Sequence, residues 1–374
     1  MGKIKSIKTH PVVAPLQRKQ KTAYEAREDV SIIIVELQTD DGIVGYGKIN
    51  NTPLKDIVGW VEKLSEIVIG MDASPVAVWE KMFSHTAPAP DRGAFPRSSR
   101  ALVTAAMAGI DFALWDALGK RANLPVFRLL GGENRPVMAY STGGYYVEGG
   151  TPESAAAEIA KFVEDGYKAV KLKGGGSPLQ NEIARVRATR EAIGPDVKLM
   201  VDVSGAYDLE DAIEYARAIA PYDITWLEEP MHWYLQPADY VRLAQASPVP
   251  IAHGEREWHR FTTRDFISSG AIKYVQFDAS RHAGFTEGLR IAHFADQCGV
   301  LIAPHHAPEL QCHLIAAFPR CGFVVEAHGL PQRDPIWHNV FTDRAQLKDG
   351  YFHLSEKPGF GVEFDWDFIE KHRA

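Results

Sequence analysis

The sequence predicts an α/β protein in which an eight-stranded barrel is accompanied by a smaller α+β domain. Seven short apolar runs in the second half of the chain each end in a polar residue, at steps of 21 to 29 residues. The polar residues are Lys173, Asp202, Glu228, Glu255, Asp278, His305 and Glu326. Barrels of alternating strands and helices use about 31 residues per unit, so a compact barrel fits. The length of 374 residues also exceeds what one core usually holds, which predicts the second domain.

The first 130 residues do not show the alternation of strands and helices that is typical of a barrel. In order, the predicted elements are strands at residues 1–14 and 30–39, a turn and strand at DDGIVGYG, and helices at residues 54–69 and 98–120. The polar segment at residues 18–29 is too long for a tight hairpin and is predicted to be a loop. Residues 1–130 are therefore predicted to form a separate α+β layer.

The barrel is predicted over residues 131–327, and its first strand lies within RPVMAYSTGG. Thr151 followed by Pro152 predicts the start of the first barrel helix, because a Thr N-cap and a Pro in the first turn are typical there. Six further helices are predicted at residues 180–193, 209–220, 237–246, 262–269, 284–297 and 309–317. After the eighth strand, a tail at residues 328–374 contains Pro and Gly turns and is predicted to return to the first domain.

Composition narrows the function classes. The chain has 41 Lys and Arg against 48 Asp and Glu, which gives a net charge of −7. It contains no run of basic residues, so nucleic-acid binding is not expected. An anionic substrate would therefore be attracted by local cations, namely a metal ion and lysines. The sequence contains no run of 18 or more apolar residues, so a membrane span is not expected. The three cysteines form no paired framework and the chain opens without a signal-peptide pattern, so we expect a reducing cytoplasm.

Three carboxylates end neighbouring strands of the predicted barrel: Asp202, Glu228 and Glu255. Three pairs at about 4–5 Å, with an effective dielectric near 20, would cost roughly 10 kcal/mol in repulsion, comparable with the stability of a whole domain. A cation relieves this repulsion, and an all-oxygen site favours Mg²⁺. The alternative is pairing of individual carboxylates with an arginine such as Arg256 or Arg281.

At two of these positions a second glutamate lies close by, so the strand register decides which of the two could be the metal ligand. Within Glu228-Glu229, strand alternation lets only one carboxylate face the barrel mouth, and the spacing favours Glu228. Glu255 and Glu257 present the same ambiguity.

Lys171 and Lys173 are two residues apart, so both are predicted to point into the barrel. We expect the neighbouring cation and a divalent metal to lower their pKa values toward neutrality, which would make one of them a base. The alternative, in which the lysines only balance the carboxylates, is stronger for Lys171.

Asp278 and His305 end adjacent strands, so the carboxylate could fix one tautomer of the imidazole and raise its basicity. His306 is predicted to point away from the mouth. Glu326, on the last strand, could hydrogen-bond a developing oxyanion or a substrate hydroxyl, or it could form a salt bridge to a lysine.

The chain resembles the enolase superfamily, in its mandelate racemase-like branch, over nearly its whole length. The matching motifs are DDGIVGYG, GIDFALWDALGK, PVFRLLGG, VKLKGG, VDVSGAYD, WLEEP, IAHGE, FDASRHAGFTEG, APHHAPELQCHL and PGFGVEF. The resemblance implies a modified (β/α)₇β barrel with a capping domain built from the N-terminal region and the C-terminal tail. It implies one Mg²⁺ held by Asp202, Glu228 and Glu255, a base at Lys173 and a dyad of Asp278 and His305.

Two positions depart from the family pattern. Ser204 stands where relatives often have Asn, and Lys48 stands where relatives commonly have Glu. These departures bear on the substrate more than on the reaction class.

The family implies removal of the proton α to a carboxylate, giving an enolate neutralised by Mg²⁺ and Lys171. We expect dehydration of an acid sugar to a 2-keto-3-deoxy acid, with Lys173 or His305 as the base and His305 protonating the departing 3-hydroxyl. Polar residues that could bind a polyhydroxy substrate are Tyr24, Arg27, Asn50, Asn51, Ser204, His232, His253 and His328. Racemisation or epimerisation, cycloisomerisation and a silent binding protein remain alternatives, and a homo-oligomer is expected.

Overall fold

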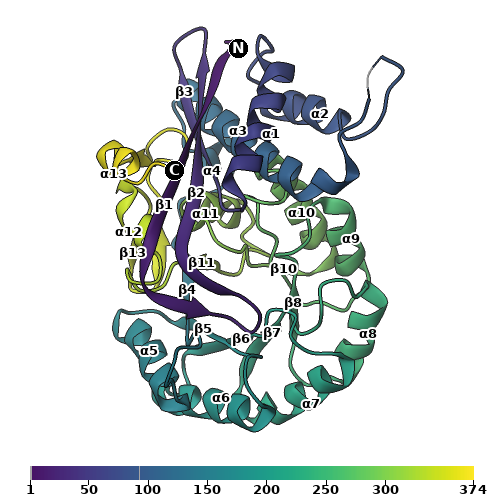
Figure 1. The fold of residues 1–374 in the computed structure, drawn as a ribbon, viewed down its shortest axis with the longest axis vertical. Coiled ribbons are helices and arrows are strands. Elements are labelled where there is room, and N and C mark those ends of the chain that lie inside the picture. Colours follow the sequence, from purple (N-terminus) through teal and green to yellow (C-terminus); the bar gives the residue numbers. More distant parts are fainter. Residues whose placement is uncertain (1, 92) are drawn as a thin grey trace.

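The structure is a computed structural model that describes residues 2–91 and 93–374, apart from the side chains of Arg18 and Arg97; residue 1 of the first predicted strand lies outside this part. It has an upper α+β layer and a lower barrel whose helices form the outer rim (Figure 1). The two regions are in contact through helix α3, which lies between the small sheet and the barrel.

Eight parallel strands form the barrel, as predicted. They are β4 (Val137–Gly143), β5 (Ala169–Lys173), β6 (Lys198–Asp202), β7 (Ile224–Glu228), β8 (Ile251–His253), β9 (Tyr274–Val275), β10 (Leu301–Ile302) and β11 (Val325–Ala327). Strands β4 to β10 pair in chain order, and β11 pairs with β4. A bridge between Ile302 of β10 and Gly322, which precedes β11, closes the barrel. Side chains such as Tyr140, Met200 and Trp226 fill the interior below the mouth, so the barrel is packed.

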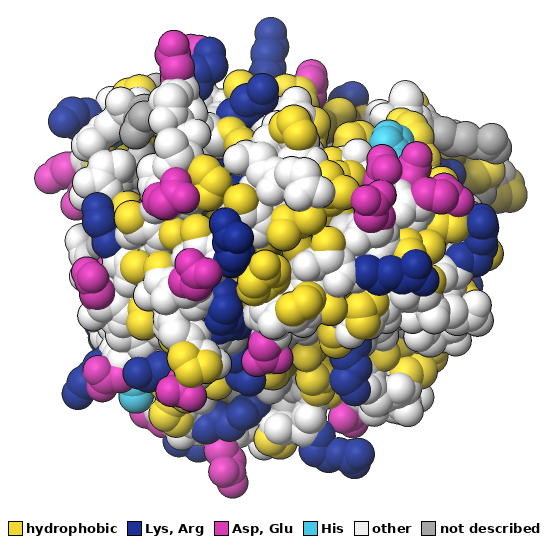
Figure 2. Space-filling view, turned by 90° about the horizontal axis from the view of Figure 1, so that it is seen from below, with side chains coloured by type: hydrophobic (Ala, Val, Ile, Leu, Met, Phe, Trp, Pro, Cys, Tyr) yellow, Lys and Arg dark blue, Asp and Glu magenta, His cyan; other side chains and the backbone are white. Residues whose placement is uncertain are grey.

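Seven helices follow the first seven strands: α5 (Pro152–Glu164), α6 (Leu179–Ile193), α7 (Leu209–Ile219), α8 (Pro237–Ala246), α9 (Arg260–Ser268), α10 (Phe285–Cys298) and α11 (Pro308–Ala317). Thr151 caps α5 as predicted, because its side chain accepts from the Ser154 backbone N–H. A short helix, η2 (Ala220–Tyr222), follows α7, while η1 (Arg97–Ser99) and α4 (Val126–Leu129) precede the first barrel strand. Seen from below, acidic and basic side chains are interspersed among apolar ones on the outer surface (Figure 2).

The N-terminal layer contains β1 (Ile4–Lys21), β2 (Ala26–Thr39), β3 (Val44–Ile49), α1 (Leu54–Val68), α2 (Pro75–Ser84) and α3 (Arg100–Ala122). The predicted loop at residues 18–29 is wrong: both strands continue through it, pairing Gln20 with Arg27 and Lys21 with Ala26, and the turn occupies only the residues between them. Polar composition misled the prediction, because a two-stranded arm exposed on both faces needs no apolar alternation. Helix α2 was not predicted.

Strand β3 packs directly on helix α3. A Cβ atom at Gly45 or Gly47 would collide with backbone atoms of Ala113 or Gly109, so glycine is required at this close approach. By length and composition α3 could cross a membrane, contrary to the expectation from the sequence, but 83% of its apolar window is buried inside the protein. A core role accounts for that apolar sequence, and a cytoplasmic location stays a prediction.

The tail contains α12 (Pro335–Asn339), β12 (Phe341–Asp343), β13 (Gln346–Lys348), β14 (Tyr351–His353), β15 (Glu363–Phe364) and α13 (Trp366–Lys371). The tail contacts both regions. Helix α12 contacts β1 and β2, strand β14 pairs with barrel strand β4, and Arg373 bridges to Val12 of β1. The domain boundaries at residues 130 and 327 stay predictions.

Candidate active site at the barrel mouth

Strand register places three of the predicted residues side by side. In the ladder from β5 to β7, Lys173 pairs with Asp202 and Asp202 pairs with Glu228. The carboxyl ends of parallel barrel strands share one rim, so these side chains converge because of backbone hydrogen bonding alone.

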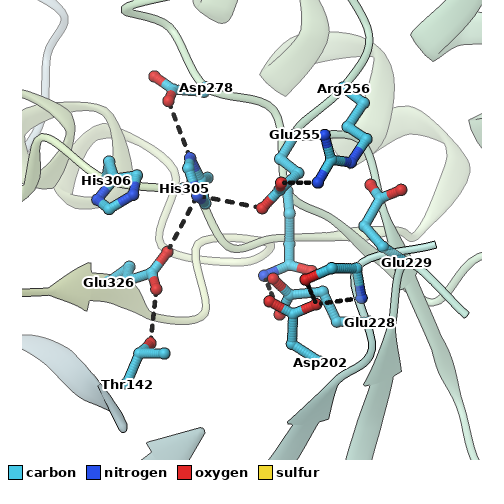
Figure 3. Close-up of polar contacts among 12 residues, drawn as sticks. Thr142, Asp202, Glu228, Glu229, Glu255, Arg256, Asp278, His305, His306 and Glu326 are labelled. Atoms are coloured by element: carbon cyan, nitrogen blue, oxygen red, sulfur yellow. Dashed lines mark hydrogen bonds and ion pairs between the residues drawn. The ribbon is translucent and has the colours of Figure 1, made fainter. Parts of the chain in front are cut away.

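The three predicted metal ligands form a buried cluster. Asp202, Glu228 and Glu255 each offer an oxygen, and these oxygens lie within 4.8 Å of one another (Figure 3). Asp202 Oδ1 accepts from the Ser204 N–H at 2.8 Å and hydroxyl at 3.0 Å. Glu228 Oε2 accepts from Trp226 Nε1 at 2.9 Å and Gln276 Nε2 at 2.8 Å. An all-oxygen set of this size, with its outer oxygens held by donors, fits Mg²⁺.

The neighbouring glutamates, Glu229 and Glu257, both contact His253; for Glu229 this agrees with strand alternation, whereas the sequence leaves the choice between Glu255 and Glu257 open. Glu229 Oε2 lies 3.1 Å from His253 Nδ1, and Glu257 Oε1 lies 3.2 Å from His253 Nε2. Burial lowers the pKa of His253, but these two carboxylates outweigh burial and raise it to about 9. His253 is therefore a buried structural cation and does not line the pocket; the prediction that it contacts substrate is wrong.

The lysines are bonded to the predicted metal ligands. Lys171 Nζ lies 2.6 Å from Glu228 Oε1 and 3.2 Å from Glu326 Oε1, and Lys173 Nζ donates to Asp202 Oδ2. Burial lowers the pKa of Lys171, but Glu228 and Glu326 outweigh it and hold the pKa well above its usual value. The pKa of Lys173 is likewise raised, because Asp202 outweighs the effect of burial. The predicted lowering is therefore wrong for the protein's own charges, since a carboxylate contacts each ammonium directly.

The pKa values of Asp202 and Glu228 shift in opposite directions, although each carboxylate contacts a lysine. Burial opposes ionisation of Asp202, but Lys173 and Lys171 lower its pKa below the usual value. Burial raises the pKa of Glu228 to about 8 despite its contact with Lys171. Mutual repulsion among the carboxylates adds to this rise, which is the imbalance that a divalent cation would relieve.

Asp278 and His305 form the predicted contact. His305 Nδ1 lies 2.9 Å from Asp278 Oδ2, and Nε2 lies 3.1 Å from Glu255 Oε2 (Figure 3). Burial raises the pKa of Asp278 to about 6, while burial, His306 and Arg281 lower the pKa of His305 well below its usual value. The expected rise in imidazole basicity is therefore wrong: burial outweighs the carboxylate and keeps His305 neutral.

Glu326 and His306 complete this side of the mouth. Glu326 Oε1 accepts from the Thr142 hydroxyl at 2.6 Å, and its Oε2 lies 3.8 Å from His305 Nε2. Burial opposes ionisation of Glu326, but Lys171 and Lys173 lower its pKa. The prediction that His306 points away is wrong, because its ring lies 3.9 Å from the His305 ring and lines the pocket. A positive φ of 53° at His306 breaks the strand alternation that the prediction assumed.

A cavity of about 740 Å³ opens above these groups, between the barrel mouth and the β1–β2 hairpin. Among its lining residues are six of the eight side chains predicted to bind substrate: Tyr24, Arg27, Asn50, Asn51, Ser204 and His328. His232 is not among the described residues that line it. Sequence reasoning missed Tyr145, Trp233, Arg256, Arg281 and Arg333, which lie in loops without a periodic signal.

The hairpin tip contacts the barrel through Arg256, and nearby the Tyr146 N–H donates to the Lys21 carbonyl at 2.9 Å. Arg256 donates to the Tyr24 hydroxyl, and its guanidinium lies 5.0 Å from the Tyr24 ring centroid and 4.8 Å from that of Trp233. Arg256 follows Glu255 directly and lies 3.5 Å from its Oε1. The tip of the hairpin and a predicted metal ligand thus share a partner.

Comparisons with known proteins agree with this architecture. Residues 4–131 match the family described as Mandelate racemase / muconate lactonizing enzyme, N-terminal domain, and residues 154–368 match Enolase C-terminal domain-like. Arabinonate dehydratase of Saccharolobus solfataricus is 31% identical, covering 93% of this chain and 92% of its own. D-galactarolactone cycloisomerase of Agrobacterium fabrum is 30% identical, covering 99% of each chain.

A solved structure extends the likeness to three dimensions. L-talarate/galactarate dehydratase from Salmonella typhimurium LT2, liganded with Mg and L-lyxarohydroxamate, superposes with a TM-score of 0.87 at 27% identity, covering all of this chain and 94% of that one. Together with the family matches, this likeness accounts for the barrel, its cap and the acidic cluster. The chain is therefore a lyase of the enolase superfamily and belongs to its mandelate racemase/muconate lactonizing enzyme branch.

Proposed function

We propose that the protein is a Mg²⁺-dependent acid sugar dehydratase that removes the proton α to the carboxylate and expels the 3-hydroxyl, giving a 2-keto-3-deoxy acid. The observation that carries the proposal is a trio of carboxylates with an ammonium at one end and a neutral imidazole at the other. Lys173 contacts Asp202, and His305 contacts Glu255. Relatives named as dehydratases of arabinonate, talarate, galactarate and galactonate support the reaction class.

One magnesium ion is proposed per site, held by Asp202, Glu228 and Glu255. When bound, it would neutralise negative charge that develops on the substrate carboxylate, an effect worth several kcal/mol. Lys171, buried against Glu228 and Glu326, supplies a second positive charge at the same place. Glu326 is placed by Thr142 to contact a substrate oxygen.

The acid and base groups follow from the protonation states. A neutral His305 can accept a proton at Nε2, because Nδ1 faces Asp278. His305 can then give that proton to the departing 3-hydroxyl, so one residue could act first as the base and then as the acid. Lys173, on the other side of the trio, is the second candidate for removing the α proton: it is an ammonium beside Asp202, and a bound divalent cation would lower its pKa toward that of a base. A positioned base contributes roughly 10² to 10⁴ in rate.

A second reaction is favoured by the placement of Lys173 and His305 at opposite ends of the carboxylate trio. Two groups on opposite sides could exchange the α proton without loss of water, giving racemisation or epimerisation. Cycloisomerisation through the same enolate is supported by relatives with that name. Deuterium incorporation from D₂O without formation of a keto acid would identify these reactions.

The test is a substrate screen. Purified protein with Mg²⁺ is incubated with a library of aldonic and aldaric acids, and 2-keto-3-deoxy acids are measured as semicarbazones. Keto acid formed from at least one sugar acid, and lost on chelation with EDTA, is the expected result. Absence of keto acid from every member of the library would contradict dehydration. The homo-oligomeric state stays a prediction, and sedimentation of the same sample measures it.

A further inference from the structure

The pocket wall has no surplus positive charge. The described lining residues include five cationic side chains and six carboxylates. The cations are Arg27, Lys173, Arg256, Arg281 and Arg333. One Mg²⁺ would offset the charge of one substrate carboxylate and the enolate formed from it, and nothing in this balance offsets another anion.

Each of the five cations already has a partner within the protein. Arg27 Nη2 lies 2.8 Å from Glu25, and Arg333 Nε lies 3.1 Å from Glu158. Arg281 Nε lies 3.4 Å from Asp278 and donates to the Asn50 carbonyl at 3.1 Å. Arg256 and Lys173 are bonded to Tyr24 and Asp202 as described above. A second substrate carboxylate would have to share a guanidinium that already serves an acceptor of the protein, which weakens the recognition.

Two imidazoles on the same wall, in contrast, have ring nitrogens without partners. Nδ1 of His306 and Nε2 of His328 are buried and make no hydrogen bond. The two rings lie 5.0 Å apart, and both residues line the pocket. Buried polar atoms are normally satisfied, so two unsatisfied nitrogens on residues that line a pocket point to a place where a ligand could bind.

The protein holds the His328 ring and the backbone of His306 in place. His328 Nδ1 lies 2.5 Å from Asp334 Oδ2, and its ring stacks on Trp337 at 5.1 Å. His306 and Ala307 both have left-handed backbone angles, with φ of 53° and 43°. Gln311 Nε2 donates to the carbonyls of His305 and His306 at 2.7 and 2.8 Å, which fixes this strained turn. Strain of this kind persists where surrounding contacts enforce it, and it gathers at functional sites.

We propose that the substrate is an aldonic acid, a sugar acid with a single carboxylate, and that His306 and His328 bind hydroxyl groups on the part of the chain remote from that carboxylate. A hydroxyl suits both rings because it donates and accepts, whatever the tautomer. The inference rests on the proposed function, which requires a sugar acid but leaves one or two carboxylates open.

The first test compares matched acids. Each aldonic acid is assayed beside the aldaric acid of the same configuration, for example galactonate beside galactarate, which differ only in the terminal alcohol or carboxylate. We expect kcat/KM for the best aldonate to exceed that of its matched aldarate at least tenfold. An aldarate that reacts equally well or better would overturn this inference and leave dehydration intact. Failure of the enzyme to act on any sugar acid would overturn the proposed function and this inference together.

The second test uses His306→Asn and His328→Phe, with the exposed His353→Ala as the matched control. Asn tolerates the left-handed backbone at position 306, and Phe keeps the stack on Trp337 while removing Nε2. We expect KM for the aldonate to rise at least fivefold in each variant. Exchange of the α proton of glycerate, which lacks the remote hydroxyls, should change less than twofold in His328→Phe and less than KM does in His306→Asn, whose ring adjoins His305. An unchanged KM, or an equal loss with glycerate, would overturn the role of these rings. Thermal melting shows whether either variant has lost its fold, and the remaining variant then decides.

Discussion

The barrel mouth and the cap above it contribute to one pocket, but their side chains are positioned by different means. At the mouth, Lys173, Asp202 and Glu228 are neighbours because their strands pair in register. In the cap, Tyr24 reaches the pocket because Arg256, more than 200 residues later, binds its hydroxyl and its ring. Register is a local property repeated eight times, whereas the cap depends on single contacts between distant segments. The mouth should therefore tolerate changes in the cap far better than changes at strand ends.

The interface between the N-terminal layer and the barrel, called the seam below, contains buried polar pairs of its own. Lys48 of β3 pairs with Glu309 of α11, and Trp337 Nε1 of the tail donates to the same carboxylate at 2.9 Å. Asp111 of α3 accepts from the Thr286 N–H and hydroxyl, both at 2.7 Å, at the start of α10. Lys48, which departs from the family pattern, is thus explained by a partner in the barrel.

The largest effect is expected at the mouth, from His305→Asn. Elimination should fall by roughly 10² to 10⁴ because the proton donor to the departing hydroxyl is lost. Keto acid formation and deuterium exchange are measured on the same sample. Exchange that survives assigns the base to Lys173, and exchange that disappears assigns it to His305. Elimination at the wild-type rate would refute the role of His305. His353→Ala is the control.

Glu309→Gln tests the seam. Removing one partner of a buried ion pair leaves Lys48 uncompensated and should lower the free energy of unfolding by about 3–5 kcal/mol. Urea denaturation measures it. Glu356→Gln breaks the exposed pair with Arg128 and should change stability far less. Equal effects of the two substitutions would show that the seam contributes no more than the surface.

Asp111 gives the seam a pH dependence. Burial raises its pKa to about 7, so the folded chain keeps a proton that the unfolded chain loses near pH 4. Stability should fall as pH rises from about 4 to 7, by up to about 4 kcal/mol, and level off above. Urea denaturation at pH 5 and pH 8 measures the slope, and Asp111→Asn should flatten it. A variant with the wild-type slope would contradict the assignment.

Gln276→Leu tests a residue behind the metal site. Gln276 donates to Glu228 Oε2, and loss of such an outer partner typically lowers metal affinity 10- to 100-fold. Activity as a function of Mg²⁺ concentration measures the shift. The exposed Gln346→Leu is the control. An unchanged Mg²⁺ requirement would mean that Glu228 needs no support from this amide.

The smallest effect is expected at the hairpin tip. Tyr24→Phe removes the hydroxyl bonded to Arg256 but keeps the ring contact. KM should rise a few-fold with kcat nearly unchanged, since the hairpin only covers the substrate. Steady-state kinetics with Tyr234→Phe, at an exposed position, as the control measures this. A large drop in kcat would mean that the cap and the mouth are coupled more tightly than proposed.

Sequence reasoning failed where a contact, and not a pattern, decides the structure. His306 was placed on the wrong face because a left-handed residue interrupts the alternation. The arm at residues 18–29 was predicted as a loop because its strands lack an apolar face. The pKa values of Lys171 and His305 were misjudged because burial and the distance to each carboxylate appear only in the folded protein.

The sequence by itself determined the barrel and placed Lys173, Asp202 and Glu228 at the ends of its strands; Glu255, Asp278 and His305 lie two or three residues beyond theirs. It could do so because the period of a strand and the repeat of a strand–helix unit are local properties of the chain. Only the tertiary structure decided which side chains of the cap, the loops and the tail line the pocket, and which ionisable groups are paired. Those properties depend on burial and on contacts between residues hundreds of positions apart, which no local pattern encodes.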